Sequence, residues 1–198
     1  MTTIHPGMVF GPLLSDDIDG ASAELLTKMI NGKIPALPDA YFTVVDVRDI
    51  AKLHVESLTN NKSDNKRIIA TSPKGINIME ISNILRKNGY VKAPKNFIPT
   101  KMINSLAPFN KEMKSMAAMV NRGSYDADIT ETISIFDWKP IPLEKTLIDM
   151  GSSLKQIECK WTNKRVMTKV LLHLQIHNLT TINFNSTMIS QSRKEIYV

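Results

Sequence analysis

The stretch from Ile4 to Pro12, I-H-P-G-M-V-F-G-P, decides how the rest of the sequence is interpreted. Its apolar residues predict a buried strand. Proline is poorly tolerated in a central strand, so Pro6-Gly7 predicts a point at which strand pairing loosens. The dipeptide Gly11-Pro12 then predicts a turn. We therefore interpret this stretch as an interrupted strand that ends in a turn.

A second strand is predicted further along the sequence, and it leads directly into a helix. Residues 41–47 are rich in β-branched and aromatic side chains, which predicts a short strand. Asp46 is placed to cap the following helix, and Asp49 to supply the reciprocal acid of a capping box. Five residues are expected to share one packed face of this helix: Val47, Ala51, His54, Val55 and Leu58.

Further elements are indicated by apolar residues at helical spacing and by glycine and proline stops. Helices are expected near residues 21–30, 78–88, 100–106, 110–120, 126–135 and 143–157, and another strand at 67–71. The expected fold class is α/β, in which strands alternate with helices. The segment 158–198 has no glycine or proline and is expected to be a basic tail, unassigned to the main fold and a candidate for disorder.

Composition and charge exclude several classes of protein. The chain has 198 residues, 42% apolar and 22% charged, which is typical of a globular protein. The net charge is +6, but residues 1–157 hold 19 basic and 17 acidic side chains, whereas residues 158–198 hold 6 and 2. The main part of the chain therefore has no concentrated basic face for nucleic acid. The absence of a long apolar run argues against a membrane span.

Cysteine and histidine usage favours a reducing compartment and no metal site. Cys159 is the only cysteine, which excludes an intrachain disulfide and favours a cytoplasmic location. The first residues show no signal peptide. His173 and His177 have the spacing of a helical metal pair, but no carboxylate lies near them in sequence, so no metal is expected.

Five segments, in order, resemble the extended short-chain dehydrogenases/reductases. The first segment is 5–12, similar to that family's Asn-Pro-Gly-x-Val-x-Gly-Pro, and the others are 42–54, 67–70, 78–85 and 136–144. The closest likeness is to the dihydroflavonol-reductase and aldehyde-reductase-like branch of the NAD-dependent epimerase/dehydratase family. His5 replaces the usual Asn, and Asp137 replaces the usual Gly before Trp138.

This resemblance implies a fold and a site. The fold would be the C-terminal part of a Rossmann-type reductase, an incomplete parallel sheet with a helical substrate-binding part over residues 1–157. NADP or NAD would contact the segment formed by Pro6, Gly7, Met8 and Val9. Leu14 and Ser15 would border the substrate. For these two residues, a solvated lead-in to the next helix is an equally good interpretation.

Two parts that the family uses are absent from the sequence. The eight glycines never form the Gly-x-x-Gly-x-x-Gly turn that holds the cofactor pyrophosphate. The family's catalytic pair is Tyr-x-x-x-Lys, but Val45, Pro94 and Ile129 stand four positions after the first three tyrosines. The chain is thus expected to resemble the half that follows the catalytic helix, to hold no catalytic residue and to be inactive alone.

The predicted function is that of an NAD(P)-dependent oxidoreductase that reduces an aldehyde, ketone or dihydroflavonol-like carbonyl to an alcohol. The expected partners are a small carbonyl compound and a polypeptide carrying the N-terminal half, with no nucleic acid and no membrane. Two alternatives stay open: a non-catalytic binding module, and part of a nucleotide-sugar epimerase or dehydratase. The last would require arginines in a diphosphate pocket, and no recognisable motif holds them.

Overall fold

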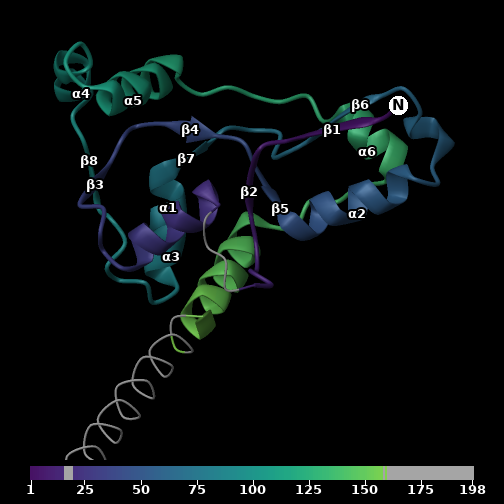
Figure 1. Ribbon diagram of the computed structural model, residues 1–198, viewed down its shortest axis with the longest axis horizontal. Coiled ribbons are helices and arrows are strands. Elements are labelled where there is room, and N and C mark those ends of the chain that lie inside the picture. Colours follow the sequence, from purple (N-terminus) through teal and green to yellow (C-terminus); the bar gives the residue numbers. More distant parts are fainter. Residues whose placement is uncertain (16–19, 158, 160–198) are drawn as a thin grey trace, which may run out of the picture. The chain divides into compact units, whose positions relative to one another are not determined.

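The computed structural model describes residues 1–15, 20–157 and 159. Contacts divide the chain into two units, Met1–Leu154 and Lys155–Val198. Nearly all of the second unit lies outside the described residues, and so do His173 and His177. The strands and helices of the first unit are shown in Figure 1.

The opening strand is interrupted as expected. β1 (Thr3–Pro6) pairs in parallel with β6 (Arg67–Ala70), and β2 (Met8–Phe10) pairs in parallel with β5 (Val44–Asp46). The change of partner falls at Gly7, whose N–H still donates to Ala70 O at 3.2 Å, while Met8 N–H donates to Thr43 O at 2.8 Å. A Cβ at Gly7 would overlap Thr71 and the backbone of Thr43. These two segments can therefore approach the opening strand so closely only because residue 7 is a glycine.

The strand predicted over residues 41–47 is in fact two strands with different partners. β4 (Tyr41–Phe42) pairs antiparallel with β7 (Ile76–Asn77), whereas β5 belongs to β2. The switch occurs at Thr43, the carbonyl of which accepts from Met8 N–H. β3 (Ala36–Leu37) and β8 (Asn96–Phe97) form a further parallel pair.

The predicted helices are confirmed with small shifts at their ends. They are α1 (Ala21–Ile30), α2 (Val47–Ser57), α3 (Ile78–Lys87), α4 (Thr100–Leu106), α5 (Lys111–Arg122) and α6 (Thr130–Phe136), and residues 143–157 are also helical. A short 3-10 turn, Asn61–Ser63, precedes β6. Gly32 and Gly89 adopt positive φ of 70° and 89° just beyond α1 and α3, which ends each helix there.

Two hydrophobic clusters lie on opposite faces of the β2–β5 pair. Side chains alternate along a strand, so neighbouring residues face opposite sides. Phe10 and Val44 pack into the cluster with α1, α3 and helix 143–154, whereas Val9 and Val45 pack into the cluster with α2 and α6. Helices on both faces of a mostly parallel set of strands make this an α/β fold, as predicted (Figure 1).

Three expectations about α2 were wrong. Val55 is 67% exposed and Leu58 84%, so the face expected to pack is open, and Leu53 with Asp49 is buried instead. His54 is exposed, with Nδ1 2.8 Å from Ile50 O. Asp49 does not complete a capping box, because its Oδ2 accepts from Ile141 N–H at 2.9 Å. Helical spacing shows which residues share a face but not which face a distant segment covers.

None of the helices within the described residues is both long and apolar enough to cross a membrane.

Candidate functional site

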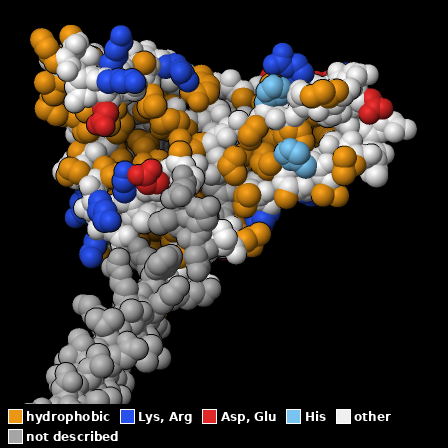
Figure 2. Space-filling model, viewed as in Figure 1, with side chains coloured by type: hydrophobic (Ala, Val, Ile, Leu, Met, Phe, Trp, Pro, Cys, Tyr) orange, Lys and Arg blue, Asp and Glu red, His pale blue; other side chains and the backbone are white. Residues whose placement is uncertain are grey.

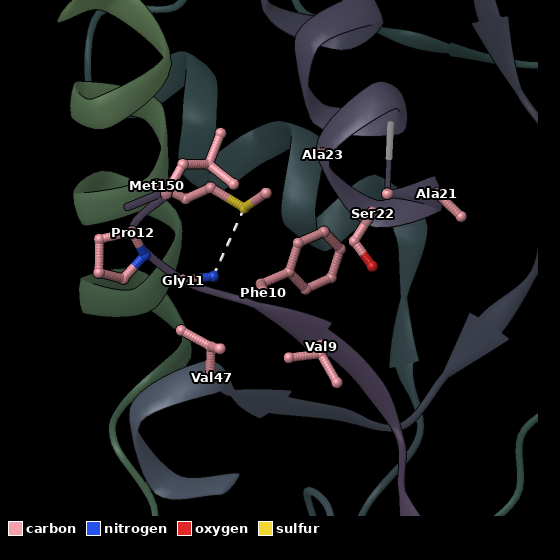
Figure 3. Close-up of a pocket in the computed structure, with 11 residues that line it drawn as sticks. Val9, Phe10, Gly11, Pro12, Ala21, Ser22, Ala23, Val47 and Met150 are labelled. Atoms are coloured by element: carbon pink, nitrogen blue, oxygen red, sulfur yellow. Dashed lines mark hydrogen bonds between the residues drawn. The ribbon is translucent and has the colours of Figure 1, made fainter. Parts of the chain in front are cut away.

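A pocket of about 260 Å³ opens where β2 ends and α1 begins. One wall is the strand end and turn from Val9 to Leu13, and the other is the start of α1 from Gly20 to Ala23. Val47 and Met150 complete the lining (Figure 3). These residues come from four separate parts of the chain and all belong to the first unit.

The turn at Gly11 shapes this pocket. Gly11 has a φ of 138°, a conformation that side-chain-bearing residues rarely adopt, and a Cβ here would lie 2.6 Å from Val47 Cγ1. Its N–H points to Met150 Sδ at 3.5 Å, the interaction drawn in Figure 3. Leu13 N–H donates to Ser153 Oγ at 3.0 Å. The turn is therefore fastened to helix 143–154 at two points.

The same helix is fastened to β5 by a charged cluster beside the pocket. Asp46, whose side chain is fully buried, accepts bonds from Arg48 Nε at 2.9 Å and Arg48 Nη2 at 2.7 Å. It also accepts from the Arg48 N–H at 2.8 Å, which caps α2 as predicted, and from Thr146 Oγ1 at 2.7 Å. Arg48 Nη1 then donates to Asp149 Oδ2 at 2.7 Å, and Lys145 adds a third cation–carboxylate contact at 3.1 Å.

Electrostatics within this cluster favour the charged forms. Burial opposes ionisation of Asp46, but hydrogen bonds from Arg48 and Thr146 outweigh it and hold the pKa of its carboxyl below the usual value. The hydrogen bond from Arg48, joined by Lys145, lowers the pKa of Asp149. The pKa of Arg48 is raised chiefly by its bond to Asp46. The cluster is thus a structural clamp, because its carboxylates are committed to cations and are poor proton donors.

The predicted cofactor residues are spread along the strand rather than gathered in the pocket. Val9 is part of its lining, whereas Met8, Gly7 and the exposed Pro6 precede the pocket along the strand and do not line it. Their role as cofactor contacts stays a prediction.

The two predicted substrate residues, Leu14 and Ser15, also lie outside the lining. Leu14 is fully exposed, and Ser15 is exposed beside the undescribed residues 16–19. Their substrate role stays a prediction as well.

Several pocket residues were not predicted from the sequence. Phe10, Gly11 and Pro12 belong to the segment that carried the resemblance, and the Gly-Pro turn was a usable signal for them. Met150 lay in the apolar stripe expected for residues 143–157, but nothing in the stripe indicated which member reaches β2. Among the described residues, no group of His, Cys, Asp and Glu is placed to hold a metal ion.

Comparisons of the sequence with known proteins find similarity to oxidoreductases. An oxidoreductase of Saccharomyces cerevisiae is 33% identical over 90 residues, 42% of this chain and 26% of that protein. The cinnamoyl-CoA reductase of Medicago truncatula is 32% identical over 87 residues, 44% of this chain and 26% of that enzyme. No family model matches the chain. The matched part of the chain thus spans about a quarter of the length of each of these relatives.

Solved structures extend the likeness to most of the described residues. The yeast methylglyoxal/isovaleraldehyde reductase Gre2, in complex with NADPH, superposes with a TM-score of 0.56 at 20% identity, over 79% of this chain and 47% of that one. The chain resembles an extended short-chain dehydrogenase/reductase. The likeness extends to the UDP-glucose 4-epimerase of Thermotoga maritima, with a TM-score of 0.54 at 17% identity over 77% of this chain and 45% of that one.

The lining of the pocket beside Gly11 suits an apolar ring better than a phosphate group. The described residues that line it are apolar apart from the backbone and the hydroxyl of Ser22, and none of them is Lys or Arg. A flat apolar ring with an amide group fits such a wall, since the ring packs on apolar atoms and the amide bonds to backbone groups. A phosphate group would find no cation there.

Proposed function

We propose that residues 1–157 form the nicotinamide- and substrate-facing part of an NAD(P)-dependent reductase that converts an aldehyde or ketone into an alcohol. The observation that carries this proposal is the pairing of Met8 with Val44 in β2 and β5, which ends at the apolar pocket beside Gly11. In a parallel α/β sheet, ligands bind beyond the carboxyl ends of the strands. The pocket lies at that end of both strands.

The pocket residues would orient the reacting groups and exclude water from them. NAD(P)H, when bound, supplies the hydride, and Val9 and Phe10 offer an apolar wall for its ring. Gly11 lets the backbone approach closely, and Ser22 Oγ is available to the carboxamide. Excluding water from this end strengthens every polar contact made there and protects the hydride from side reactions.

This chain on its own is proposed to lack reductase activity. Protonation of the nascent alkoxide needs a positioned acid, which the family supplies from Tyr-x-x-x-Lys, and the sequence contains no such pair. It also contains no Gly-x-x-Gly-x-x-Gly turn for the cofactor phosphates. Both parts are proposed to come from a polypeptide that pairs with this one in the cytoplasm.

The exposed face of α2 supports such a partner. Val47 (39% exposed), Val55 and Leu58 present apolar side chains to solvent, and Ile69 of β6 is 39% exposed. Figure 2 shows hydrophobic side chains gathered over α2 and β1, with histidine among them. Within the part of the chain that the structure describes, β1 pairs with β6 alone, which leaves its other edge open to an added strand.

The test measures where the cofactor contacts this chain. Saturation-transfer NMR with NADPH should show stronger transfer to the nicotinamide protons than to the adenine protons. Ala21→Trp, which fills the pocket from an exposed position at its rim, should reduce the transfer at least several-fold. Ala118→Trp, exposed on α5 and outside the pocket, is the matched control. Stronger transfer to adenine, or equal effects of both variants, would refute the proposed site.

Activity is tested separately. The purified chain, mixed with NADPH and an aldehyde or a dihydroflavonol, should not lower the NADPH absorbance above the rate of a blank. Oxidation of NADPH at an ordinary enzymatic rate, on the order of 1 per second or faster, would show that the chain is a complete catalyst and that the proposed division of labour is wrong.

A further inference from the structure

A second depression lies in the first unit, on the side of α1 and α3 where these helices end. It holds about 260 Å³ and is lined by the loop after α1, including Gly32 and Ile34, and by the segment after α3. β3 and β8 bring these two segments together, because they come after the two loops and pair in parallel with Ala36 opposite Asn96. The depression is therefore built by the fold, although the two segments are some sixty residues apart in sequence.

Arg86 is held rigidly at the wall of this depression. Its Nη1 donates to Val91 O at 2.6 Å and to Ala93 O at 2.9 Å, and both carbonyls belong to the same wall. These two bonds use one nitrogen of the guanidinium. Among the described residues, Nε and Nη2 have no hydrogen-bond partner, so three of the five N–H donors remain available. A pre-positioned guanidinium loses little side-chain entropy when it binds an anion.

The described residues that line the depression carry a positive charge. They include Lys92, Lys95 and Arg86, and none of them is Asp or Glu. None of these three cations forms an ion pair with a described residue. Lys33 and Lys87 are their sequence neighbours in the two segments and are exposed. Figure 2 shows Lys and Arg side chains gathered at the left of the view, about half-way down, where Figure 1 places α1 and α3. Cations that line a concave surface raise the local concentration of anions.

We propose that this depression binds a phosphate-bearing anion. The free edge of the Arg86 guanidinium would bond two phosphate oxygens at once, a fork geometry that suits phosphate, and Lys92 and Lys95 would neutralise the remaining charge. The volume is slightly below the roughly 300–1,000 Å³ of ordinary ligand pockets. It therefore fits a phosphate or diphosphate group rather than a large ligand. A free phosphate ester and a lipid headgroup share this chemistry.

Binding is tested on the full chain with inorganic pyrophosphate by calorimetry, at low and at moderate salt. Saturable binding with one site is expected, and Lys92→Gln with Lys95→Gln should weaken it at least tenfold. Lys101→Gln with Lys114→Gln, two exposed lysines on α4 and α5, is the matched control and should change it less than twofold. A linear, unsaturable signal, or equal weakening in both double variants, would overturn the proposal.

A further variant separates charge from geometry. Arg86→Lys keeps the positive charge but loses the planar fork, so binding should weaken at least fivefold while far-UV circular dichroism stays unchanged. If Arg86→Lys disturbs the fold, the lysine pair above still decides the proposal. Binding that is unchanged in a folded Arg86→Lys protein would count against the guanidinium as the anion contact.

The source of the phosphate is separated by a competition experiment. Vesicles that contain phosphatidic acid are sedimented with the protein, with and without free pyrophosphate. Sedimentation that pyrophosphate and the lysine pair both abolish identifies a headgroup as a ligand of the site. Pyrophosphate binding without sedimentation identifies a soluble phosphate. Sedimentation that neither abolishes, together with no pyrophosphate binding, would refute the site.

Discussion

Asp46→Asn should destabilise the first unit by about 2–3 kcal/mol. The Asp46 carboxylate is fully buried and accepts four hydrogen bonds, three from Arg48 and one from Thr146. Asparagine keeps the oxygen that caps α2, since Asn and Asp are comparable N-caps. Its amide nitrogen, however, takes the place of Oδ2 and faces Arg48 Nη2, so that two hydrogen-bond donors point at each other. The change therefore isolates the ion pair from the cap.

The magnitude depends on what is lost and what remains. The charge-assisted bond from Arg48 Nη2 to Oδ2 is lost, worth about 1.5–3 kcal/mol, and the buried amide N–H then faces another donor. The Thr146 hydroxyl, which also donates to Oδ2, can instead accept from the amide. The loss is limited because the Arg48 side chain is 36% exposed and still pairs with Asp149. A fully buried pair broken in this way costs about 3–5 kcal/mol. We therefore expect a loss in the free energy of unfolding of about 2–3 kcal/mol, in the lower part of these two ranges together.

Urea and thermal unfolding followed by circular dichroism measure this change. At about 2–4 °C per kcal/mol for a unit of this size, the melting temperature should fall by about 4–12 °C. Thr146→Val, which removes one hydroxyl donor, should cost about 1 kcal/mol. Asp64→Asn is the control, since its exposed side chain bonds to no other described residue. If Asp46→Asn lies within about 1 kcal/mol of this control, the clamp does not stabilise the fold.

Three further predictions concern pH and two backbone positions. The pKa values of Asp46 and Asp149 are lower in the folded chain than in the unfolded one, so the stability that these carboxylates contribute is present above the unfolded pKa near 4 and is lost as the pH falls through the folded pKa values. Acid unfolding of Asp46→Asn should therefore show a shallower loss of stability below about pH 4. An unchanged profile would refute the role of Asp46 in the acid sensitivity of the fold. Gly7→Ala should cost about 2 kcal/mol in urea unfolding because its Cβ would overlap the Thr71 side chain and the Thr43 backbone. Gly20→Ala, with no atom within 4 Å, should stay within about 0.5 kcal/mol. Asp137 occupies the left-handed region, with φ 45° and ψ 40°, so Asp137→Gly should raise stability by about 0.5–1 kcal/mol; a loss of stability in the melting curve would mean that the aspartate side chain stabilises this turn.

Local patterns predicted most of the elements. The interruption at Pro6-Gly7 was correct, since β1 ends at Pro6, which has no N–H to donate, and the change of strand partner falls at Gly7. The cap at Asp46 was correct because a cap involves the side chain and a backbone N–H two residues away. The ordered segments also carried the resemblance to short-chain reductases, and the comparisons agree with it.

Long-range contacts decided the rest. Asp49 was expected to bond within its own helix, but its acceptor atom is taken by Ile141 N–H, 92 residues later. The face of α2 that is buried depends on which segments lie beside it, and the open face carries Val55 and Leu58. Spacing along a helix is a local property, whereas burial requires a second surface supplied by another part of the chain.

The pocket and the charged clamp illustrate the same division. Each local piece, the strand end at Gly11, the start of α1 and the stripe that contains Met150, was visible in the sequence. Their meeting at one cavity depends on how β2 and β5 pair and on how helix 143–154 packs across their ends. A linear pattern encodes the conformation and polarity of each segment, but the free energy that joins distant segments comes from burial and ion pairing, which exist only after the chain has folded.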